Sequence, residues 1–232
     1  MALDSKTFRT RAATAIFFVI IMLTGLLWNA LSFILLFTII HFGCWYEFVK
    51  LLKKIRPSTW LNFLPLGLLY ITLPILLLLL CGFPYVDSIF GQQGSDVAWN
   101  YSPVLPCGII FSIWVNDTMA YIIGSWIGKK SLSKISPKKT WEGTIGGILL
   151  CVLTISLIGK AVDYYTLADW IIIAACSSIF GTFGDLLESK LKRMAKVKDS
   201  GTIMPGHGGF LDRFDSLLTA SVATGLYYFF FM

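Results

Sequence analysis

Residues 60–82 read WLNFLPLGLLYITLPILLLLLCG, a run without a charged side chain. A helix of about 20 apolar residues crosses the roughly 30 Å hydrocarbon core of a bilayer, so this run is long enough to span a membrane. Pro65 and Pro74 interrupt it. The sequence leaves open whether it forms one kinked helix or two broken pieces.

The composition of the whole chain favours a membrane protein. Its 232 residues are 56% hydrophobic and 14% charged, with a mean hydropathy of +0.74, whereas soluble domains carry about 25% charged residues. These values exclude an ordinary water-soluble enzyme, a disordered regulator and a coiled coil. The five cysteines form no C-x-x-C pair, so they indicate neither a zinc site nor a disulfide framework.

Apolar runs of membrane length recur along the chain. We therefore expect an all-α, polytopic integral membrane protein of about seven transmembrane helices, forming a single membrane domain over residues 1–232 with polar cytoplasmic loops. The expected spans are residues 12–28, 30–48, 60–82, 103–128, 143–162, 167–184 and 216–232.

The basic residues predict the orientation of these spans by the positive-inside rule. With a cytoplasmic N-terminus, every Lys and Arg except Lys160 falls on the cytoplasmic side. We therefore expect a multi-pass protein of the cell membrane with its N-terminus and polar loops in the cytoplasm. Because the net charge of +6 lies in these loops, we expect no nucleic-acid partner.

Asp117 lies inside a predicted span, in the run IWVNDTMAY of residues 113–121. An ionisable group at membrane depth costs at least about 2.5–3.5 kcal/mol and is by default a functional residue. Two interpretations remain open. Asn116 and Thr118 satisfy Asp117 in a helix-packing cluster, or Asp117 lines a water-filled polar cavity.

Residues 128–143 read GKKSLSKISPKKTWEG and combine five lysines with three serines and a threonine. Ammonium and hydroxyl groups suit phosphate oxygens. A positive-inside loop that touches anionic lipid headgroups has the same composition, so lysine content does not separate the two interpretations. The segment is not a Walker loop, because the required glycine spacing is absent.

Acidic residues gather in two later segments. Asp185, Glu188, Ser189 and Lys192 stand at i, i+3, i+4 and i+7, which is one helical face if the sixth span continues through them; an intrahelical ladder of ion pairs is the alternative. Residues 205–216 read PGHGGFLDRFDS. Their glycines permit close approach of a ligand, and their two aspartates head the last span, where simple helix capping is the alternative.

Together these acids predict a metal site. We expect Asp185 and Asp212, joined by Asp215 or Glu188, to converge at the cytoplasmic membrane surface, where clustered carboxylates repel unless a cation holds them. Oxygen ligands without His or Cys favour Mg²⁺ or Mn²⁺ over Zn²⁺. Neighbouring lysines fit a nucleotide triphosphate, and two-metal sites support in-line displacement at phosphorus.

This region resembles the signature of the phosphatidate cytidylyltransferase (CDP-diacylglycerol synthase) family, approximately S-x-L-K-R-x4-K-D-x-G-x2-[LIF]-P-G-H-G-G-x2-D-R-x-D. Residues 189–215 carry it in the same spacing, with Met204 at the position of the usual Leu, Ile or Phe. Residues 117–128 and 136–143 also look like family elements. The resemblance therefore covers about residues 116–216.

The resemblance implies an integral membrane nucleotidyltransferase that converts CTP and phosphatidate to CDP-diacylglycerol and pyrophosphate, in contact with membrane lipids. It implies Mg²⁺ in a di-metal centre whose second ion is divalent or monovalent, and it suggests a homodimer. Within the single domain, residues 1–102 would form the N-terminal spans and 103–232 the catalytic spans and loops.

The resemblance also assigns site residues. The residues expected in catalysis are Asp185, Ser189, Lys192, Arg193, Asp212, Arg213 and Asp215. The residues expected to contact the substrates are Asp117, Ser136, Lys138, Lys139, Thr140, Glu142, Lys198, Asp199, His207 and Gly208. The expected metal ligands are Asp185, Glu188, Asp212 and Asp215.

Other functions remain open on the sequence. A transporter or channel would use Asp117 and the loop acids as an ion pathway, although the one-sided charge cluster disfavours it. A related membrane enzyme, such as a CTP-dependent synthase of an ether lipid or a polyprenol kinase, would share the site but differ in its lipid pocket. Trp126, Trp141 and Phe210 are candidates either for stacking on cytosine or for the membrane-interface belt, and we favour the belt.

Overall fold

The computed structural model describes residues 5–83, 101–203 and 208–232. In these residues the regular structure is helical, and the pairing of Ser131 with Thr140 is an isolated bridge rather than a strand. The expected all-α class is therefore confirmed for the described part of the chain.

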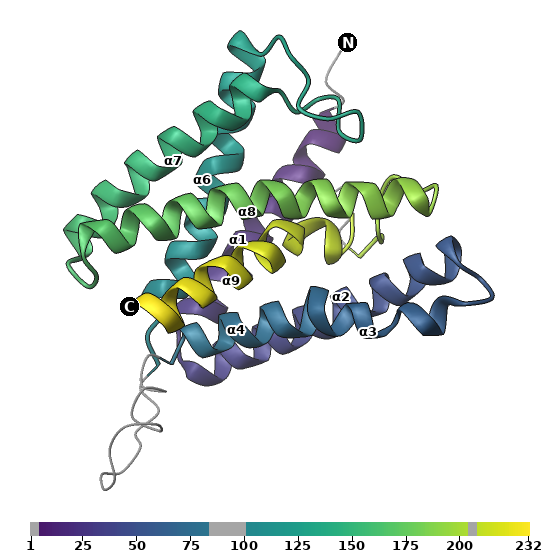
Figure 1. The fold of residues 1–232 in the computed structure, drawn as a ribbon, viewed down its shortest axis with the longest axis horizontal. Helices are drawn as coiled ribbons and strands as arrows, with labels where there is room; N and C mark the ends of the chain where they lie inside the picture. Colours follow the sequence, from purple (N-terminus) through teal and green to yellow (C-terminus); the bar gives the residue numbers. More distant parts are fainter. Residues whose placement is uncertain (1–4, 84–100, 204–207) are drawn as a thin grey trace, which may run out of the picture. The chain divides into compact units, whose positions relative to one another are not determined.

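Figure 1 shows the helices of the described residues in their order along the chain. A 3₁₀ turn at Trp60–Phe63 and a π-helical stretch at Leu68–Thr72 flank the short α3. The α-helices are α1 (Ser5–Leu27), α2 (Ala30–Ile55), α3 (Pro65–Gly67), α4 (Leu73–Cys81), α6 (Val104–Ile127), α7 (Trp141–Val162), α8 (Leu167–Met194) and α9 (Leu211–Phe231).

Five helical segments of the described chain are long and apolar enough to cross a membrane. They are Ala30–Ile55, Trp60–Cys81, Val104–Ile127, Trp141–Val162 and Leu167–Met194. The protein is thus a polytopic membrane protein, but the expected count of seven is not confirmed. The apolar part of α1 covers only Ala13–Leu27, and the spans expected at 12–28 and 216–232 stay predictions.

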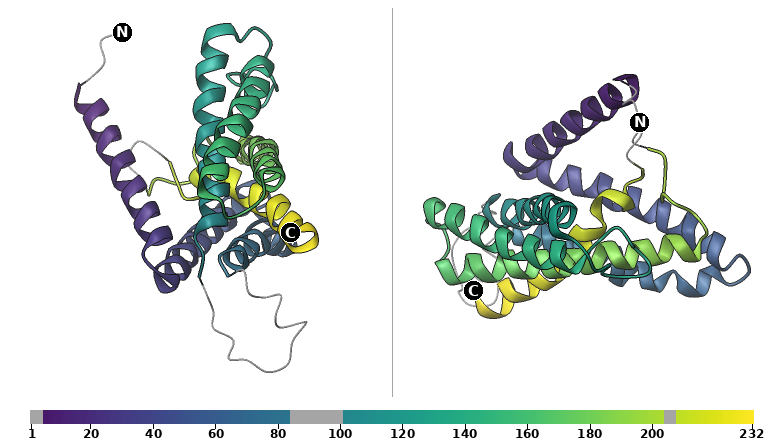
Figure 2. Two further views of the ribbon diagram at one scale, coloured as in Figure 1. Left: turned by 90° about the vertical axis from the view of Figure 1, so that its left-hand side faces the viewer. Right: turned by 90° about the horizontal axis from the view of Figure 1, so that it is seen from above.

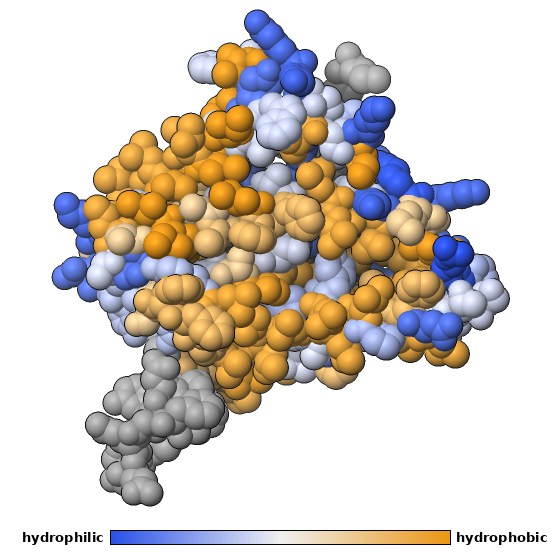
Figure 3. Space-filling view, viewed as in Figure 1, coloured by the Kyte–Doolittle hydropathy of each residue, from blue (hydrophilic) through white to orange (hydrophobic). Residues whose placement is uncertain are grey.

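Helix α7 has small residues on its buried side and large apolar residues on its exposed side. Its buried positions are mostly small, among them Gly143, Gly147 and Gly159, while large side chains such as Leu149 and Leu153 are exposed. Small residues let helix backbones approach closely, and large apolar residues suit lipid. Figure 3 shows hydrophobic residues over much of the surface that it presents, as this arrangement requires.

The chain forms two compact units, which we describe separately. The first comprises Met1–Thr72 with Leu191–Phe214, and the second comprises Leu73–Lys190 with Asp215–Met232. The expected single membrane domain of residues 1–232, with its division at residue 102, stays a prediction.

In the first unit, a capping box separates α1 from α2. The Ser32 backbone N–H donates to Asn29 Oδ1 at 2.8 Å, and the Asn29 N–H donates to Ser32 Oγ at 3.1 Å. Such reciprocal bonds satisfy the N–H groups that a helix start leaves unpaired. The turn at Asn29 therefore starts a new helix.

The proline-containing run of residues 60–81 stays helical but changes its winding, so it is neither a regular helix nor two separate pieces. Where α2 faces its π-helical stretch, Trp45 Nε1 donates to Thr72 Oγ1 at 2.9 Å, and His41 Nε2 lies 3.0 Å from the same oxygen. These bonds satisfy His41, so it is a packed polar residue of the helix interface.

In the second unit, α6 and α7 run side by side in Figures 1 and 2. A Cβ at Gly147 would lie 2.8 Å from Ala120 Cβ and 2.9 Å from the Ala120 backbone nitrogen. This glycine therefore sets how closely the two helices pack.

Helix α8 crosses α9 through another set of small residues. Ser177 Oγ lies 3.2 Å from Thr224 Oγ1, and Thr219 Oγ1 donates to the Phe180 carbonyl at 2.6 Å. At Gly184 a Cβ would clash with Thr219 Oγ1 and with the Asp215 carbonyl oxygen. The crossing therefore requires glycine at position 184.

We predict that Gly184→Ala lowers the free energy of unfolding by about 1–3 kcal/mol, as overpacking does in other tight interfaces. The new methyl group must displace Thr219 and backbone atoms of Asp215 on α9. Thermal unfolding of the purified protein in detergent measures the effect.

Gly181→Ala is the matched control one turn away. A Cβ there would lie 3.5 Å from Ser216 Cβ, an ordinary contact, and alanine favours the helix. This variant should melt at or slightly above the wild-type temperature. Equal melting temperatures for both alanine variants would contradict the close crossing at Gly184.

Candidate functional site

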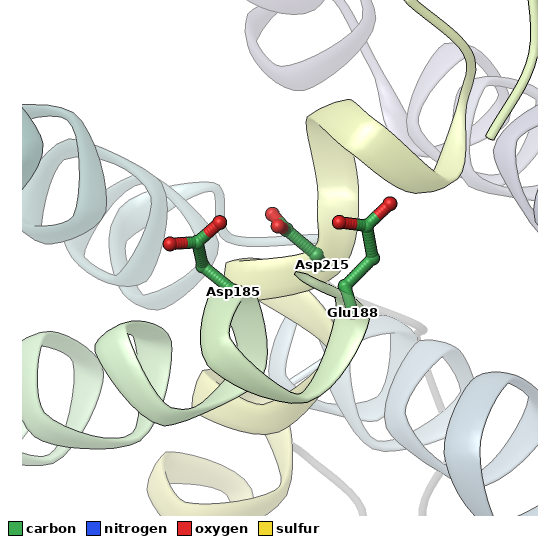
Figure 4. A group of neighbouring side chains, drawn as sticks. All are labelled: Asp185, Glu188 and Asp215. Carbon is green, nitrogen blue, oxygen red and sulfur yellow. The ribbon is translucent and has the colours of Figure 1, made fainter. Parts of the chain in front are cut away.

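Three acids of the second unit meet where α8 crosses α9. Asp185 and Glu188 come from α8 and Asp215 from α9, and each offers a carboxylate oxygen within 4.8 Å of the other two. Glu188 is 0% and Asp215 7% exposed, while Asp185 is half-buried. Figure 4 shows the three carboxylates directed to the same side of the crossing. The contact at Gly184 thus brings together acids that are up to 30 residues apart in the sequence.

This donor set fits a hard divalent cation. The group contains oxygen ligands and no His or Cys, which favours Mg²⁺ or Mn²⁺. In an octahedral Mg²⁺ site the ligand oxygens lie at most about 4.2 Å apart, twice the usual Mg–O distance, so the observed spread needs only a small contraction. Asp185, Glu188 and Asp215 are therefore the residues that could hold the metal in this unit.

A lysine of the polar loop reaches the same group. The Lys139 ammonium forms an ion pair with the Asp185 carboxylate. Asp117 on α6 interacts electrostatically with both of these residues, and Thr118 Oγ1 donates back to the Trp114 carbonyl of its own helix. Asp117 therefore belongs to the charged neighbourhood of Asp185, but the Asn116 side chain also hydrogen-bonds it. Part of the packing interpretation thus holds, and a role of Asp117 in a polar cavity stays a prediction.

The polar loop that carries Lys139 is held by its own hydrogen bonds. The Leu132 N–H donates to the Lys139 carbonyl at 2.7 Å, and the Trp141 N–H donates to the Lys130 carbonyl at 2.9 Å. Thr140 Oγ1 accepts from the Gly143 N–H and caps α7. The loop is thus a closed turn whose last residues start a helix.

Glu142 closes the other side of this turn. Its carboxylate accepts from the backbone N–H groups of Lys129 and Lys130, at 3.2–3.3 Å. The contacts of Glu142 and Thr140 organise the loop, whereas Lys138 is exposed and Ser136 half-buried. Substrate contact by these four residues stays a prediction.

The first unit holds a second charged cluster around Asp212. Lys192 Nζ donates to Asp212 Oδ1 at 2.6 Å, and Asp212 Oδ2 accepts from Ser200 Oγ at 2.9 Å and from the N–H groups of Ser200 and Gly209 at 2.8 Å. Burial raises the pKa of Asp212, but the hydrogen bonds from Gly209, Lys192 and Ser200 outweigh it and lower the pKa to about 2. Asp212 is therefore ionised at neutral pH, as a metal ligand must be.

Gly208 and Gly209 of the glycine-rich segment pack against this carboxylate. Gly208 has a φ of +84°, a backbone conformation that glycine adopts without a steric penalty. A Cβ at this position would meet Asp212 Oδ2. The close approach predicted from the glycine pattern therefore occurs, with an acid of the chain itself as the nearest group.

The structure confirms one part of the predicted acid cluster. It brings Asp185, Glu188 and Asp215 together, and it describes Asp212 in the other unit with Lys192. Both charged ends of the predicted stripe on α8 pair outside that helix, Asp185 with Lys139 and Lys192 with Asp212, which disfavours a simple intrahelical ladder. The convergence of Asp212 with the other acids stays a prediction.

The other predicted site residues have fewer described contacts. Ser189 is half-buried on α8, while Arg193, Lys198, Asp199 and Arg213 are exposed. His207 lies outside the described residues. Their roles stay predictions.

The aromatic candidates divide by environment. The Phe210 ring fills the space above Gly43 of α2 and stacks on Phe214 with ring centroids 6.5 Å apart, so it packs the protein interior. Trp126 is 87% exposed and Trp141 is 47% exposed. Exposed aromatic side chains of this kind agree with a membrane-interface belt.

Glu47 of α2 was not among the predicted site residues. It is 1% exposed, and its carboxylate accepts from Ser200 Oγ and from the N–H groups of Phe210 and Leu211. Its partners lie 153–164 residues away, so no spacing pattern links them. The one available signal was a carboxylate in a predicted span.

The sequence of this chain is similar to those of known proteins. The profile of the cytidylyltransferase family matches residues 97–231. The phosphatidate cytidylyltransferase of Staphylococcus saprophyticus is 50% identical over 109 residues, which cover 46% of this chain and 42% of that protein. Phosphatidate cytidylyltransferase 4, chloroplastic, of Arabidopsis thaliana is 40% identical over 126 residues, 54% of this chain and 32% of that protein.

The matched part thus spans less than half the length of these curated relatives. The stretch that the family profile matches contains the acids at 185, 188, 212 and 215 and the loop of Lys139. Because the family profile covers more than half of the sequence, the chain belongs to the cytidylyltransferase family.

Proposed function

We propose that the protein is a phosphatidate cytidylyltransferase, which transfers CMP from CTP to phosphatidate and releases pyrophosphate. The observation that carries the proposal is the buried group of Asp185, Glu188 and Asp215 with Lys139 at its edge. A group of carboxylates beside an ammonium group suits a nucleotide that binds together with its metal ion. The names of the relatives supply the lipid substrate.

Asp185, Glu188 and Asp215 would hold Mg²⁺, and Asp212 would supply the further carboxylate of a di-metal centre, whose second ion is divalent or monovalent. Bound Mg²⁺ would neutralise the phosphates of CTP and the charge that develops on pyrophosphate. Both substrates are anions, so this neutralisation is the main chemical requirement of the reaction.

In the proposed reaction, a phosphate oxygen of phosphatidate attacks the α-phosphorus of CTP. A new bond forms between that oxygen and the α-phosphorus, and the bond from the α-phosphorus to the oxygen that bridges to the β-phosphate breaks, with its electron pair leaving on pyrophosphate. The attacking phosphate is already anionic at neutral pH, so no general base is required.

The chain's own cations would bind and orient these groups. Lys139 and Lys192 would exchange their carboxylate partners for phosphate oxygens, and Arg193 and Arg213 would stabilise charge on the leaving group. Ser189 would line the site. The residues proposed to contact substrate are Asp117, Ser136, Lys138, Lys139, Thr140, Glu142, Lys198, Asp199, His207 and Gly208.

The positive-inside pattern supports an active site at the cytoplasmic face of the membrane, where CTP is available and the headgroup of phosphatidate lies. The same pattern supports a cytoplasmic N-terminus. A homodimer is part of the proposal by resemblance to the family.

We predict that the full chain, purified in detergent, converts labelled CTP and phosphatidate to a labelled lipid and that a Mg²⁺ chelator abolishes this product. Asp185→Asn and Asp215→Asn should lower kcat by on the order of 10²–10³-fold, as the loss of other groups that stabilise transition-state charge does. Thin-layer chromatography of the labelled lipid measures the product.

Asp163→Asn is the matched control, because Asp163 is an exposed residue at the end of α7 in a left-handed conformation that asparagine tolerates. It should keep wild-type turnover. Absence of the liponucleotide in the wild type would overturn the proposed function, and unaltered turnover in both acid variants would remove them from the metal site.

Sidedness is tested by labelling single introduced cysteines in sealed membrane vesicles with an impermeant maleimide. Lys198→Cys lies in the expected cytoplasmic segment. Ala161→Cys lies at the C-terminal end of α7, which we expect on the other side of the membrane. Both positions are exposed. We predict that Lys198→Cys reacts only from the cytoplasmic side and Ala161→Cys only from the other.

The native cysteines are buried or half-buried, so the wild-type chain serves as the background control. The reverse labelling pattern would invert the proposed topology.

A further inference from the structure

Glu47 makes contacts that its position in a membrane-length helix does not require. It lies two turns before the end of α2, and its side chain is almost completely buried. Glu47 Oε1 accepts from the Phe210 N–H at 2.9 Å, and Oε2 accepts from the Leu211 N–H at 2.9 Å and from Ser200 Oγ at 2.6 Å. A buried carboxylate with this many donors is strongly fixed in place.

Two of these donors are the backbone N–H groups at the start of α9, which begins at Leu211. The first N–H groups of a helix have no partner within the helix, and a negative charge at this end is favoured by the helix dipole. Glu47 therefore caps α9 from a remote helix.

The third donor connects Glu47 to Asp212. Ser200 Oγ lies within hydrogen-bond distance of both carboxylates, 2.6 Å from Glu47 Oε2 and 2.9 Å from Asp212 Oδ2. The Ser200 N–H also donates to Asp212. One serine therefore links the two carboxylates.

Two glycines leave room for the Glu47 carboxylate. A Cβ at Gly201 or at Gly209 would overlap Glu47 Oε1, and at Gly209 the three nearest atoms all belong to Glu47. The Gly209 N–H in turn donates to Asp212 Oδ2. The glycine turn, by which we mean residues 208–210, is therefore in contact with two acids, Glu47 and Asp212.

We propose that Glu47 is a positioning residue for nucleotidyl transfer, because it fixes the start of α9 and the glycine turn so that Asp212 is held in place to bind a metal ion. The inference rests on the proposed function for its catalytic consequence. Its structural part, the dependence of the turn and of Asp212 on Glu47, stands on the contacts of the first unit alone.

The decisive variant is Glu47→Gln, which keeps the shape but replaces one oxygen by an NH₂ group. Whichever way the amide points, its NH₂ faces a backbone N–H of Phe210 or Leu211, so one N–H loses its acceptor. We expect Mn²⁺ affinity to fall about 10–100-fold, the usual loss when a residue that orients a metal ligand is removed, and the Mg²⁺ concentration for half-maximal turnover to rise by a similar factor.

Three measurements on the full chain in detergent test the proposal. Electron paramagnetic resonance of free Mn²⁺ gives metal affinity without substrate. Limited trypsin digestion gives the rate of cleavage after the exposed Lys198, which should increase in the variant. Activity as a function of Mg²⁺ should recover at high concentration, because the metal then compensates for a poorly placed ligand; a merely structural defect would not be rescued in this way.

Asp169→Asn is the matched control. This carboxylate also accepts three hydrogen bonds, from the Thr166 N–H, Thr166 Oγ1 and Tyr227 OH, and none of these donors belongs to the glycine turn. The Asp169→Asn variant should lower the melting temperature about as much as Glu47→Gln does. Its Mn²⁺ affinity and its rate of cleavage at Lys198 should equal those of the wild type.

Gly209→Ala keeps the test decisive if Glu47→Gln does not fold, and Glu47→Asp and a double variant refine the test if it does. The alanine methyl must displace Glu47 and should reproduce the loss of Mn²⁺ affinity; Glu47→Asp keeps two acceptor oxygens and should retain more affinity than Glu47→Gln. In the double variant Glu47→Gln with Gly209→Ala the losses should not add, because both act on the same contact.

Wild-type Mn²⁺ affinity and trypsin sensitivity in Glu47→Gln, or in Gly209→Ala if the former does not fold, would overturn the positioning role. A wild-type protein that yields no liponucleotide would instead overturn the proposed function, while the Mn²⁺ and trypsin measurements would still decide the role of Glu47.

Discussion

The arrangement of the candidate site depends on carboxylates that are buried next to one another. At 4.8 Å and an effective dielectric constant of 20, two unit charges repel by about 3.5 kcal/mol, and Asp185, Glu188 and Asp215 lie at or within that separation. Lys139 offsets part of this repulsion at Asp185. A divalent cation would offset more of it, because one ion can contact all three acids. The buried acids thus favour metal binding through the same repulsion that opposes folding.

Close backbone approach is what brings the acids together. Glycine at position 184 allows α9 to pass directly over α8, so that Asp215 meets the acids of the neighbouring helix. In the other unit, Gly208 and Gly209 allow the chain to fold around Asp212. The glycines of this protein are therefore part of the site, because side chains at these positions would occupy the space of the carboxylates or of their helices.

The sequence predicted much of this structure, and its failures have physical causes. Apolar length identifies the membrane helices, and spacing at i and i+3 correctly put Asp185 and Glu188 on one face of α8. The same spacing left open whether Asp215 or Glu188 joins Asp185; both do, because Gly184 allows α9 to approach α8 closely. Glu47 escaped prediction because its partners are more than 150 residues away, and hydrogen bonds between distant segments leave no periodic pattern.

The choice of lysine as the partner of these acids has a chemical consequence. An ammonium group is a compact charge on a flexible stem, whereas a guanidinium forms a fixed, two-pronged pair with a carboxylate. Asp185 and Asp212 each pair with a lysine, from the polar loop and from the end of α8 respectively. Lysine can hold an acid while no cation is bound and move to a phosphate oxygen when a metal takes its place. In the proposed enzyme, the pairs that keep the buried acids compensated would therefore also supply the charges that bind the nucleotide, so stability without substrate and affinity for it would come from the same side chains.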